Sequence, residues 1–161
     1  MFTPSLRSRA QWLVYLLGGL LSVSVLNTGT SFWAFKFLEK KAKHPIHGLF
    51  IPNPLSPSFT LKSPSFDWRG KFQVNSGTFR VRYNPIFFLL RQKFRVQIEG
   101  RKVGVRILGE LAQSQGFSDV KVDRLEADLA FPRKGTLEIF SFDVRSPQME
   151  FHIARKEQNL D

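Results

Sequence analysis

Residues 72–107 read FQVNSGTFRVRYNPIFFLLRQKFRVQIEGRKVGVRI, and this stretch determines the fold class. Apolar side chains alternate with polar or charged ones in three short runs, at residues 79–83, 94–98 and 103–107. A period of two is typical of strands that bury one face and expose the other. The stretch therefore predicts half-buried antiparallel strands whose outward positions are rich in arginine.

The alternation extends on both sides of this stretch, from Ser58 to Ile153. We interpret Asn75–Gly77 and Glu99–Arg101 as tight turns, because glycine and small polar residues favour turns. The apolar phase changes near Asp123–Arg124 and again near Ile139–Phe140, which predicts a bulge or bend at each place. The sequence thus predicts some seven to nine strands with one apolar face that must be covered.

Two short helices are expected between the strands. Asn84-Pro85 is a helix-start signal, with Asn as the cap and Pro at the first helical position. It opens Ile86–Leu90, which either plugs the end of the sheet or dips into a bilayer. Leu108–Gly116 is the second candidate. The predicted fold class is mostly β: an N-terminal transmembrane helix, then a curved taco-like sheet or a jelly roll or sandwich.

Residues 12–35 read WLVYLLGGLLSVSVLNTGTSFWAF and contain no charge. As a helix they would reach about 36 Å, beyond a hydrocarbon core of roughly 30 Å. Aromatic rings at both ends suit the two headgroup layers, and the predicted membrane-anchor residues are Trp12, Tyr15, Phe32 and Trp33. A cleavable signal peptide is the alternative, which the length of the run and the large Phe32 near its end disfavour.

The chain is accordingly divided into five parts. These are a short tail over 1–11, a transmembrane helix over 12–35, a basic flank and proline-rich connector over 36–57, an antiparallel β domain over 58–154 and a polar tail over 155–161.

The net charge of +11 is unevenly distributed. Residues 45–107 carry eleven Lys or Arg and two acids, whereas residues 108–161 carry seven Lys or Arg and ten acids. A basic segment beside a membrane anchor indicates anionic headgroups, and the candidate headgroup contacts are Lys36, Lys40, Lys41 and Lys43. Nucleic acid is not an expected partner, because the charge comes without a recognition motif.

The orientation in the membrane is contested within the sequence. Counting the basic residues on each side favours a cytoplasmic domain, whereas a short tail with Arg7 and Arg9 favours a signal anchor with an exported domain. We take the exported side.

The sequence offers little support for an enzyme activity. The chain has no cysteine, which excludes thiol nucleophiles, thiolate metal sites and disulfides. His44 and His47 flank a proline, and His152 is expected to face solvent. Asp119, Asp123, Glu126 and Asp128 are expected to lie on a solvated strand face. We therefore predict no enzyme activity, no metal site and no cofactor.

An open, curved sheet would leave an apolar groove suited to an acyl chain, although the same residues would form the core of a closed domain. The candidate lipid-binding residues are Phe79, Val81, Tyr83, Phe94, Val96, Ile98, Val103 and Val105.

Residues 70–100 also resemble the membrane-proximal part of AsmA-like proteins, the superfamily that includes TamB. The resemblance is carried by Gly77, Val81, Tyr83, Pro85, Leu89, Leu90, Val96, Ile98 and Gly100. It implies a taco-shaped sheet with an apolar interior, a bacterial inner-membrane anchor and a periplasmic domain. It also implies a role in lipid transport between envelope membranes or in outer-membrane assembly.

This chain is short and lacks the long repeating groove of that group, which favours a component of a larger assembly. The expected partners are thus membrane lipids and a larger envelope complex. The alternative is a non-catalytic structural or adaptor subunit, and a jelly roll like that of LptC is another possibility of similar size.

Overall fold

The structure, a computed structural model, describes residues 6–42, 44–68, 72–108, 119–132, 137–147 and 150–154. Several predicted features lie outside these residues: the second short helix after Leu108, the tail over 155–161, Lys43 and the first five residues.

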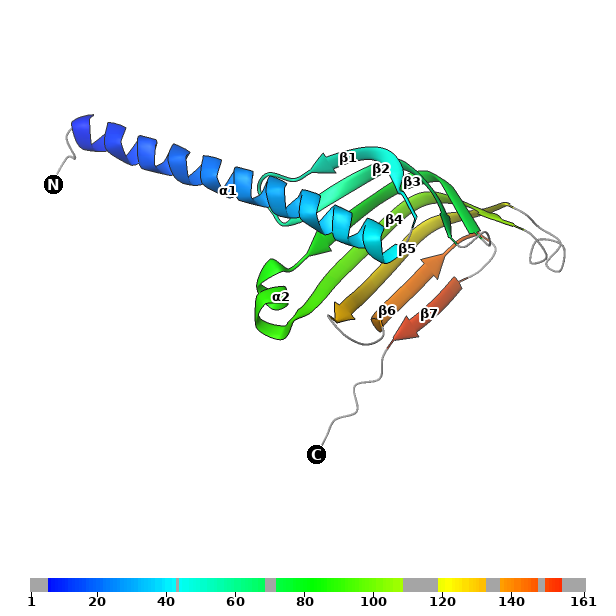
Figure 1. Cartoon of the computed structure of the whole chain (residues 1–161). Helices are drawn as coiled ribbons and strands as arrows, with labels where there is room; N and C mark the ends of the chain where they lie inside the picture. Colours follow the sequence, from blue (N-terminus) through cyan, green and yellow to red (C-terminus); the bar gives the residue numbers. More distant parts are fainter. Residues whose placement is uncertain are drawn as a thin grey trace.

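Seven antiparallel strands form one open sheet in which each strand pairs with the next along the chain. The strands are β1 (His47–Pro52), β2 (Ser58–Trp68), β3 (Phe72–Tyr83), β4 (Lys93–Ile107), β5 (Asp119–Pro132), β6 (Glu138–Arg145) and β7 (Glu150–Ala154). Strand β1 forms one edge and β7 the other. This confirms the predicted fold class in its open, curved form, and the described strands make no second sheet as a sandwich or jelly roll would (Figure 1).

The short helix after Asn84 is confirmed as α2 (Pro85–Arg91). The side chain of Asn84 accepts a hydrogen bond of 2.9 Å from the backbone N–H of Phe87, which satisfies one of the free N–H groups of the first turn. At the other end Gln92 adopts the left-handed conformation, and its N–H donates to the carbonyl of Phe88 at 2.9 Å.

The long helix α1 (Leu6–Ala42) extends beyond the predicted boundaries of 12 and 35. The polar residues Asn27 to Ser31 do not interrupt it. Thr30 Oγ1, for example, donates a hydrogen bond of 2.9 Å to the carbonyl of Leu26 within the helix. The predicted connector over 36–57 is correspondingly shorter, because its first residues are helical and its middle forms the edge strand β1. Prolines are tolerated there because an edge strand needs only one of its sides paired.

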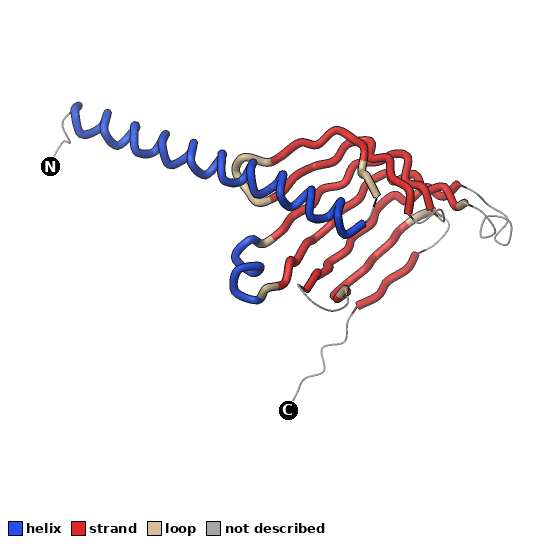
Figure 2. The backbone as a smooth tube through the Cα atoms, viewed as in Figure 1, coloured by secondary structure: helices blue, strands red, loops and turns tan. Residues whose placement is uncertain are grey.

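The two triplets interpreted as turns are a wrong prediction. Strands β3 and β4 run straight through them, as the continuous red tubes in Figure 2 show. The pairing of β3 with β4 instead shifts its register between Val74 and Thr78. Gly77 has a φ of +117° and Lys102 a φ of +52°, so the extra residues are absorbed as bulges within the strands.

These irregularities form one line across the sheet, which we call the bend line. It passes through positive-φ residues on four neighbouring strands: Gly48, Ser63, Gly77 and Lys102. On β5 it continues at Asp123, where the predicted phase change is confirmed because Val122 and Leu125 both pack into the interior. The predicted change near Ile139 is likewise confirmed by a register shift opposite Asp128 and Leu129.

The apolar face of the sheet carries two separate cores. The helix-covered core contains Ala34, Phe35, Phe59, Leu61, Val81, Tyr83, Phe94 and Val96. The distal core contains Val74, Val103, Val120 and Val122, and α1 contributes nothing to it. The bend line crosses β1 to β5 and separates the two cores, and α1 covers only the first of them.

Candidate membrane anchor and apolar sheet face

Helix α1 divides into a free half, from Gln11 to Leu26, and a packed half, from Asn27 onward. Every side chain from Gln11 to Val23 is exposed, and apolar residues dominate this free half. Side-chain contacts with the sheet begin at Asn27, and Ser31, Ala34 and Phe35 are buried. By length and composition Gln11–Lys41 is apolar enough to cross a membrane, with a mean hydropathy of 1.5 in its most apolar window. Only the free half, however, is clear of the sheet (Figure 1).

Small polar side chains fasten the packed half to the sheet. Ser31 Oγ donates to the carbonyl of Ser58 at 3.1 Å and lies 3.0 Å from the hydroxyl of Tyr83. The same hydroxyl lies 2.9 Å from Thr30 Oγ1, and Asn27 donates to the carbonyl of Pro54 at 3.1 Å. These bonds explain why the polar stretch sits in the middle of an apolar helix: its side chains bond to the sheet.

Aromatic rings fill the remaining space between helix and sheet. Phe37 packs edge-on against Phe94 at 4.8 Å between ring centroids, and Trp33 meets Phe94 at 5.4 Å. Phe35 contacts Phe59 at 6.0 Å on the other side of the helix. Two predicted anchor residues are therefore sheet contacts: Trp33, and Phe32, whose ring lies 6.4 Å from that of Phe50. The other two, Trp12 and Tyr15, are exposed on the free half.

The eight predicted groove residues all face the sheet interior, but they divide between the two cores. Val81, Tyr83, Phe94 and Val96 lie under α1, and the last two are 0% exposed. Phe79 and Ile98 pack against the same core, while Val103 and Val105 belong to the distal core. The chain's own helix thus fills the central part of the predicted groove.

The apolar face nearer the β7 edge is less covered. Ile139 on β6 and Ile153 on β7 are each 44% exposed. Leu129 and Val144 are half-buried, and the aromatic contacts of α1 reach no further across the sheet than Phe131 on β5. We call this part of the apolar face, over β5, β6 and β7, the open strip.

A cleft of about 450 Å³ lies beside the open strip, where the end of α1 meets α2 and β5. Its lining is mainly apolar and consists of Phe37, Lys41, Phe88, Leu89, Gln92, Phe131 and Pro132. Lys41 Nζ lies 5.6 Å from the ring centroid of Phe37, which places an ammonium group at this apolar cleft.

The other predicted headgroup lysines are arranged differently. Lys36 pairs with Glu39 at 2.8 Å and Lys40 is exposed, both on the packed half of α1. Lys36 lies nine residues, or about 14 Å, beyond Asn27 along the helix. Only Lys41 among the described lysines of this group lines the cleft.

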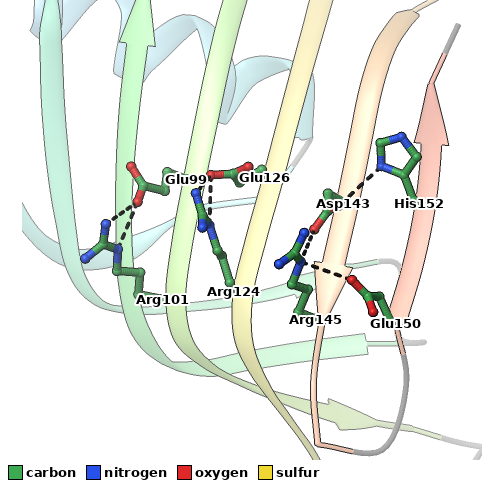
Figure 3. Close-up of polar contacts among 8 residues, drawn as sticks. All are labelled: Glu99, Arg101, Arg124, Glu126, Asp143, Arg145, Glu150 and His152. Carbon is green, nitrogen blue, oxygen red and sulfur yellow. Dashed lines mark hydrogen bonds and ion pairs between the residues drawn. The ribbon is translucent and has the colours of Figure 1, made fainter.

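The opposite face of the sheet is polar and carries rows of ion pairs. Figure 3 shows Arg101 with Glu99, Arg124 with Glu126, and Arg145 with both Asp143 and Glu150. Nearer α2, Arg95 binds Asp128 through two hydrogen bonds of 2.9 and 2.7 Å. Two of the ion pairs, Arg95 with Asp128 and Arg106 with Asp119, join the basic half of the sequence to the acidic half across β4 and β5.

Two of the paired carboxylates, those of Asp128 and Glu99, have lowered pKa values. Burial disfavours the charge of Asp128, yet hydrogen bonds from Arg95 and Gln97 outweigh it and hold the pKa of Asp128 below its ordinary value. A hydrogen bond from Arg101 likewise lowers the pKa of Glu99. His152 is exposed, as expected, and lies 3.2 Å from Asp143. Within the described ranges no group of three or more His, Cys, Asp or Glu is placed to hold a metal ion.

Sequence reasoning missed the helix side of the interior: Ser31, Ala34, Phe35 and Phe37. A signal for it is present, because Ser31, Ala34, Phe35 and Leu38 recur at helical spacing and form one face. The aromatic belt expected of a membrane helix concealed that face.

In comparisons with known proteins, no family model matched the chain, and neither a similar curated protein nor a similar solved structure was found.

Proposed function

We propose that this protein is a single-pass membrane protein whose sheet binds lipid acyl chains on the open strip. The observation that carries the proposal is the uneven cover of one apolar face. Helix α1 closes the part over β1 to β4, whereas Ile139 and Ile153 remain 44% exposed. When an apolar ligand displaces water from such a face, the free energy falls, and binding is therefore favoured.

The cleft beside α2 supplies a route to the open strip. Its apolar walls, Phe37, Phe88 and Phe131, suit an acyl chain, and Lys41 suits the phosphate of a headgroup. An acyl chain that enters there would lie along the sheet next to Leu129 and Ile139. In this proposal the protein binds and presents lipid and does no covalent chemistry.

The resemblance to AsmA-like proteins supports placing this role in a bacterial envelope. We propose an inner-membrane anchor, a periplasmic sheet, and a part in lipid transport or outer-membrane assembly. The side of the membrane has a direct test, because the chain contains no cysteine. A Lys121→Cys variant should react with a membrane-impermeant maleimide in spheroplasts if the sheet is periplasmic, and should react only after lysis if it is cytoplasmic.

Lipid binding is tested by photo-crosslinking of the full chain in living bacteria. A benzophenone amino acid replaces Val144, which faces the interior on the half of β6 away from α2. A second variant carries it at Ser141, which faces the polar side of the same strand. We expect a phospholipid-mass adduct at position 144 and none at position 141, with Leu16 on the free half of α1 as the positive control.

Two other outcomes would reject lipid binding. No adduct at position 144, with a strong one at position 16, would mean that the strip is not occupied by lipid. A discrete protein adduct would favour the adaptor alternative. That alternative rests on the two sheet edges, β1 and β7, each of which pairs with a single neighbour among the described strands, and an edge strand can pair with a strand of another protein.

A further inference from the structure

Helix α2 and the turn between β1 and β2 lie at the end of the sheet from which the free half of α1 projects (Figure 1), and both carry exposed apolar side chains. Leu55, on the turn between β1 and β2, is 68% exposed. Ile86, Leu89 and Leu90 on α2 are 65%, 78% and 76% exposed. We call these four residues the apolar rim. Four exposed apolar side chains at one end of the sheet favour contact with an apolar surface.

The inner side of α2 already has a packing role, so the apolar rim is not needed to hold α2 in place. Phe88 meets the ring of Trp33 at 5.4 Å and that of Phe94 at 6.3 Å. The helix is also capped at both ends by hydrogen bonds. The outer residues Ile86, Leu89 and Leu90 are therefore not needed for these contacts of α2, and their side chains remain exposed.

The length of the free half identifies the partner. From Gln11 to Leu26 α1 spans about 24 Å, and Arg7 and Arg9 lie before it. A hydrocarbon core is roughly 30 Å thick. Beyond Leu26 the helix is held by the sheet through Asn27 and Ser31, so it cannot slide deeper without carrying the sheet with it.

We propose that the apolar rim is seated in the bilayer that α1 crosses, at the boundary between headgroups and acyl chains. The sheet then supplies the few ångströms of depth that the free half lacks. Arg91, exposed in the last turn of α2, would lie at headgroup level. The seated rim would also place the cleft beside α2 at the membrane surface. This inference rests on the membrane crossing by α1 proposed above. Leu89 also lines the cleft beside α2, so the test below reads depth in the bilayer and not lipid binding to the open strip.

The test measures the depth of single spin labels on the full chain in vesicles of phosphatidylcholine with one quarter phosphatidylglycerol. Cysteine is introduced at one position at a time: Leu16, Leu55, Leu89, Arg82 or Lys121. Arg82 is a matched control, because it lies one residue from the β3 terminus next to α2 but on the polar face. Lys121 reports on the other end of the sheet. For each label, the spin relaxation caused by oxygen, which concentrates in lipid, is compared with the spin relaxation caused by a water-soluble nickel chelate.

We expect labels at positions 55 and 89 to lose nickel access and gain oxygen access relative to positions 82 and 121, with position 16 deepest. If position 16 is in lipid while 89 matches 121, the seating is wrong and the membrane crossing stands. If position 16 is itself in water, both proposals fail.

A second variant tests the seating without relying on the labels alone. Leu89→Asp with Leu90→Asp changes only exposed side chains, so circular dichroism should remain that of the parent. We expect the label at position 55 to regain nickel access in this variant while position 16 stays in lipid. An unchanged depth at position 55 would overturn the seating.

Discussion

The hydroxyl group of Tyr83 joins helix and sheet at a single buried point. It lies 2.9 Å from Thr30 Oγ1 and 3.0 Å from Ser31 Oγ, and Tyr83 is only 5% exposed. Ser31 keeps its bond to the carbonyl of Ser58 if the hydroxyl is removed, so the loss is limited to the bonds of one group.

Tyr83→Phe should therefore lower the free energy of unfolding by about 1 kcal/mol. Urea unfolding of the full chain in detergent micelles, followed by tryptophan fluorescence, measures the change. Tyr15→Phe is the matched control, because it removes the other tyrosine hydroxyl of the chain from an exposed site. Equal destabilisation by both variants would show that Tyr83 does not fasten α1.

The pairing of Asp128 with Arg95 gives the stability a defined dependence on pH. The pKa of Asp128 in the folded state is lowered, whereas an unfolded Asp has a pKa of about 3.9. A lowered folded pKa contributes stability that is present above about pH 4 and is lost as the pH falls through the folded value.

Asp128→Asn should accordingly lower the melting temperature at pH 7, and the gap from the parent should narrow below pH 4. Asp123→Asn, which removes a carboxylate from an exposed position on the same strand, serves as the comparison variant. Melting curves recorded between pH 7 and pH 2.5 measure both. A gap for Asp128→Asn that is constant across this range would contradict the assignment.

Among the elements, the strands owe their shape to the bend line. Gly77 has a φ of +117°, and a Cβ there would lie 3.0 Å from Val103 Cα and 3.1 Å from the carbonyl oxygen of Arg101. Both atoms belong to the backbone of β4, so the contact has no flexible side chain to relieve it.

Gly77→Ala should cost roughly 1–3 kcal/mol through backbone strain, in addition to the close contact. Gly18→Ala on the free half of α1, where nothing lies within 4 Å, should be neutral or slightly stabilising. Thermal unfolding of both variants, followed by circular dichroism, compares them. A Gly77→Ala protein as stable as its parent would mean that the bend does not need this backbone conformation.

The elements also show what local sequence can predict. Alternation identified the strands after residue 58 and the apolar face, and Asn84-Pro85 identified α2, because these signals depend on neighbouring residues alone. Strand β1 was missed because its residues lie in the proline-rich segment taken for a connector. The triplets Asn75–Gly77 and Glu99–Arg101 were mistaken for turns, since glycine and polar residues suit both turns and irregular strands and only pairing with a partner strand distinguishes them. The packing of Phe35 and Phe37 into the sheet was missed because the same rings suit a membrane interface.

On the scale of the whole molecule, the sheet and the second half of α1 form one folding unit. Without α1, Phe59, Phe94 and Val96 would lose the cover that now leaves them at most 1% exposed. Each such side chain contributes about 1.5–3 kcal/mol on burial, which is a large share of the stability of a small domain.

A chain that begins at residue 27 should therefore fold as a monomer, whereas one that begins at residue 45 should aggregate or bind a hydrophobic dye. Size-exclusion chromatography and dye fluorescence of the two purified proteins compare them. A soluble, compact chain from residue 45 would show that the sheet closes its own apolar face.

Helix α1 is continuous from Leu6 to Ala42, so the part that would lie among lipids and the part held by the sheet share one axis. A domain on a flexible linker could change its tilt relative to the membrane freely. Here the sheet can change its tilt only together with α1. In a thinner bilayer α1 would tilt further from the membrane normal, and one flank of the sheet would move toward the membrane surface. In a thicker bilayer α1 would tilt less, and that flank would move away from the surface. The thickness of the surrounding lipid would then set the direction in which the uncovered apolar strands face.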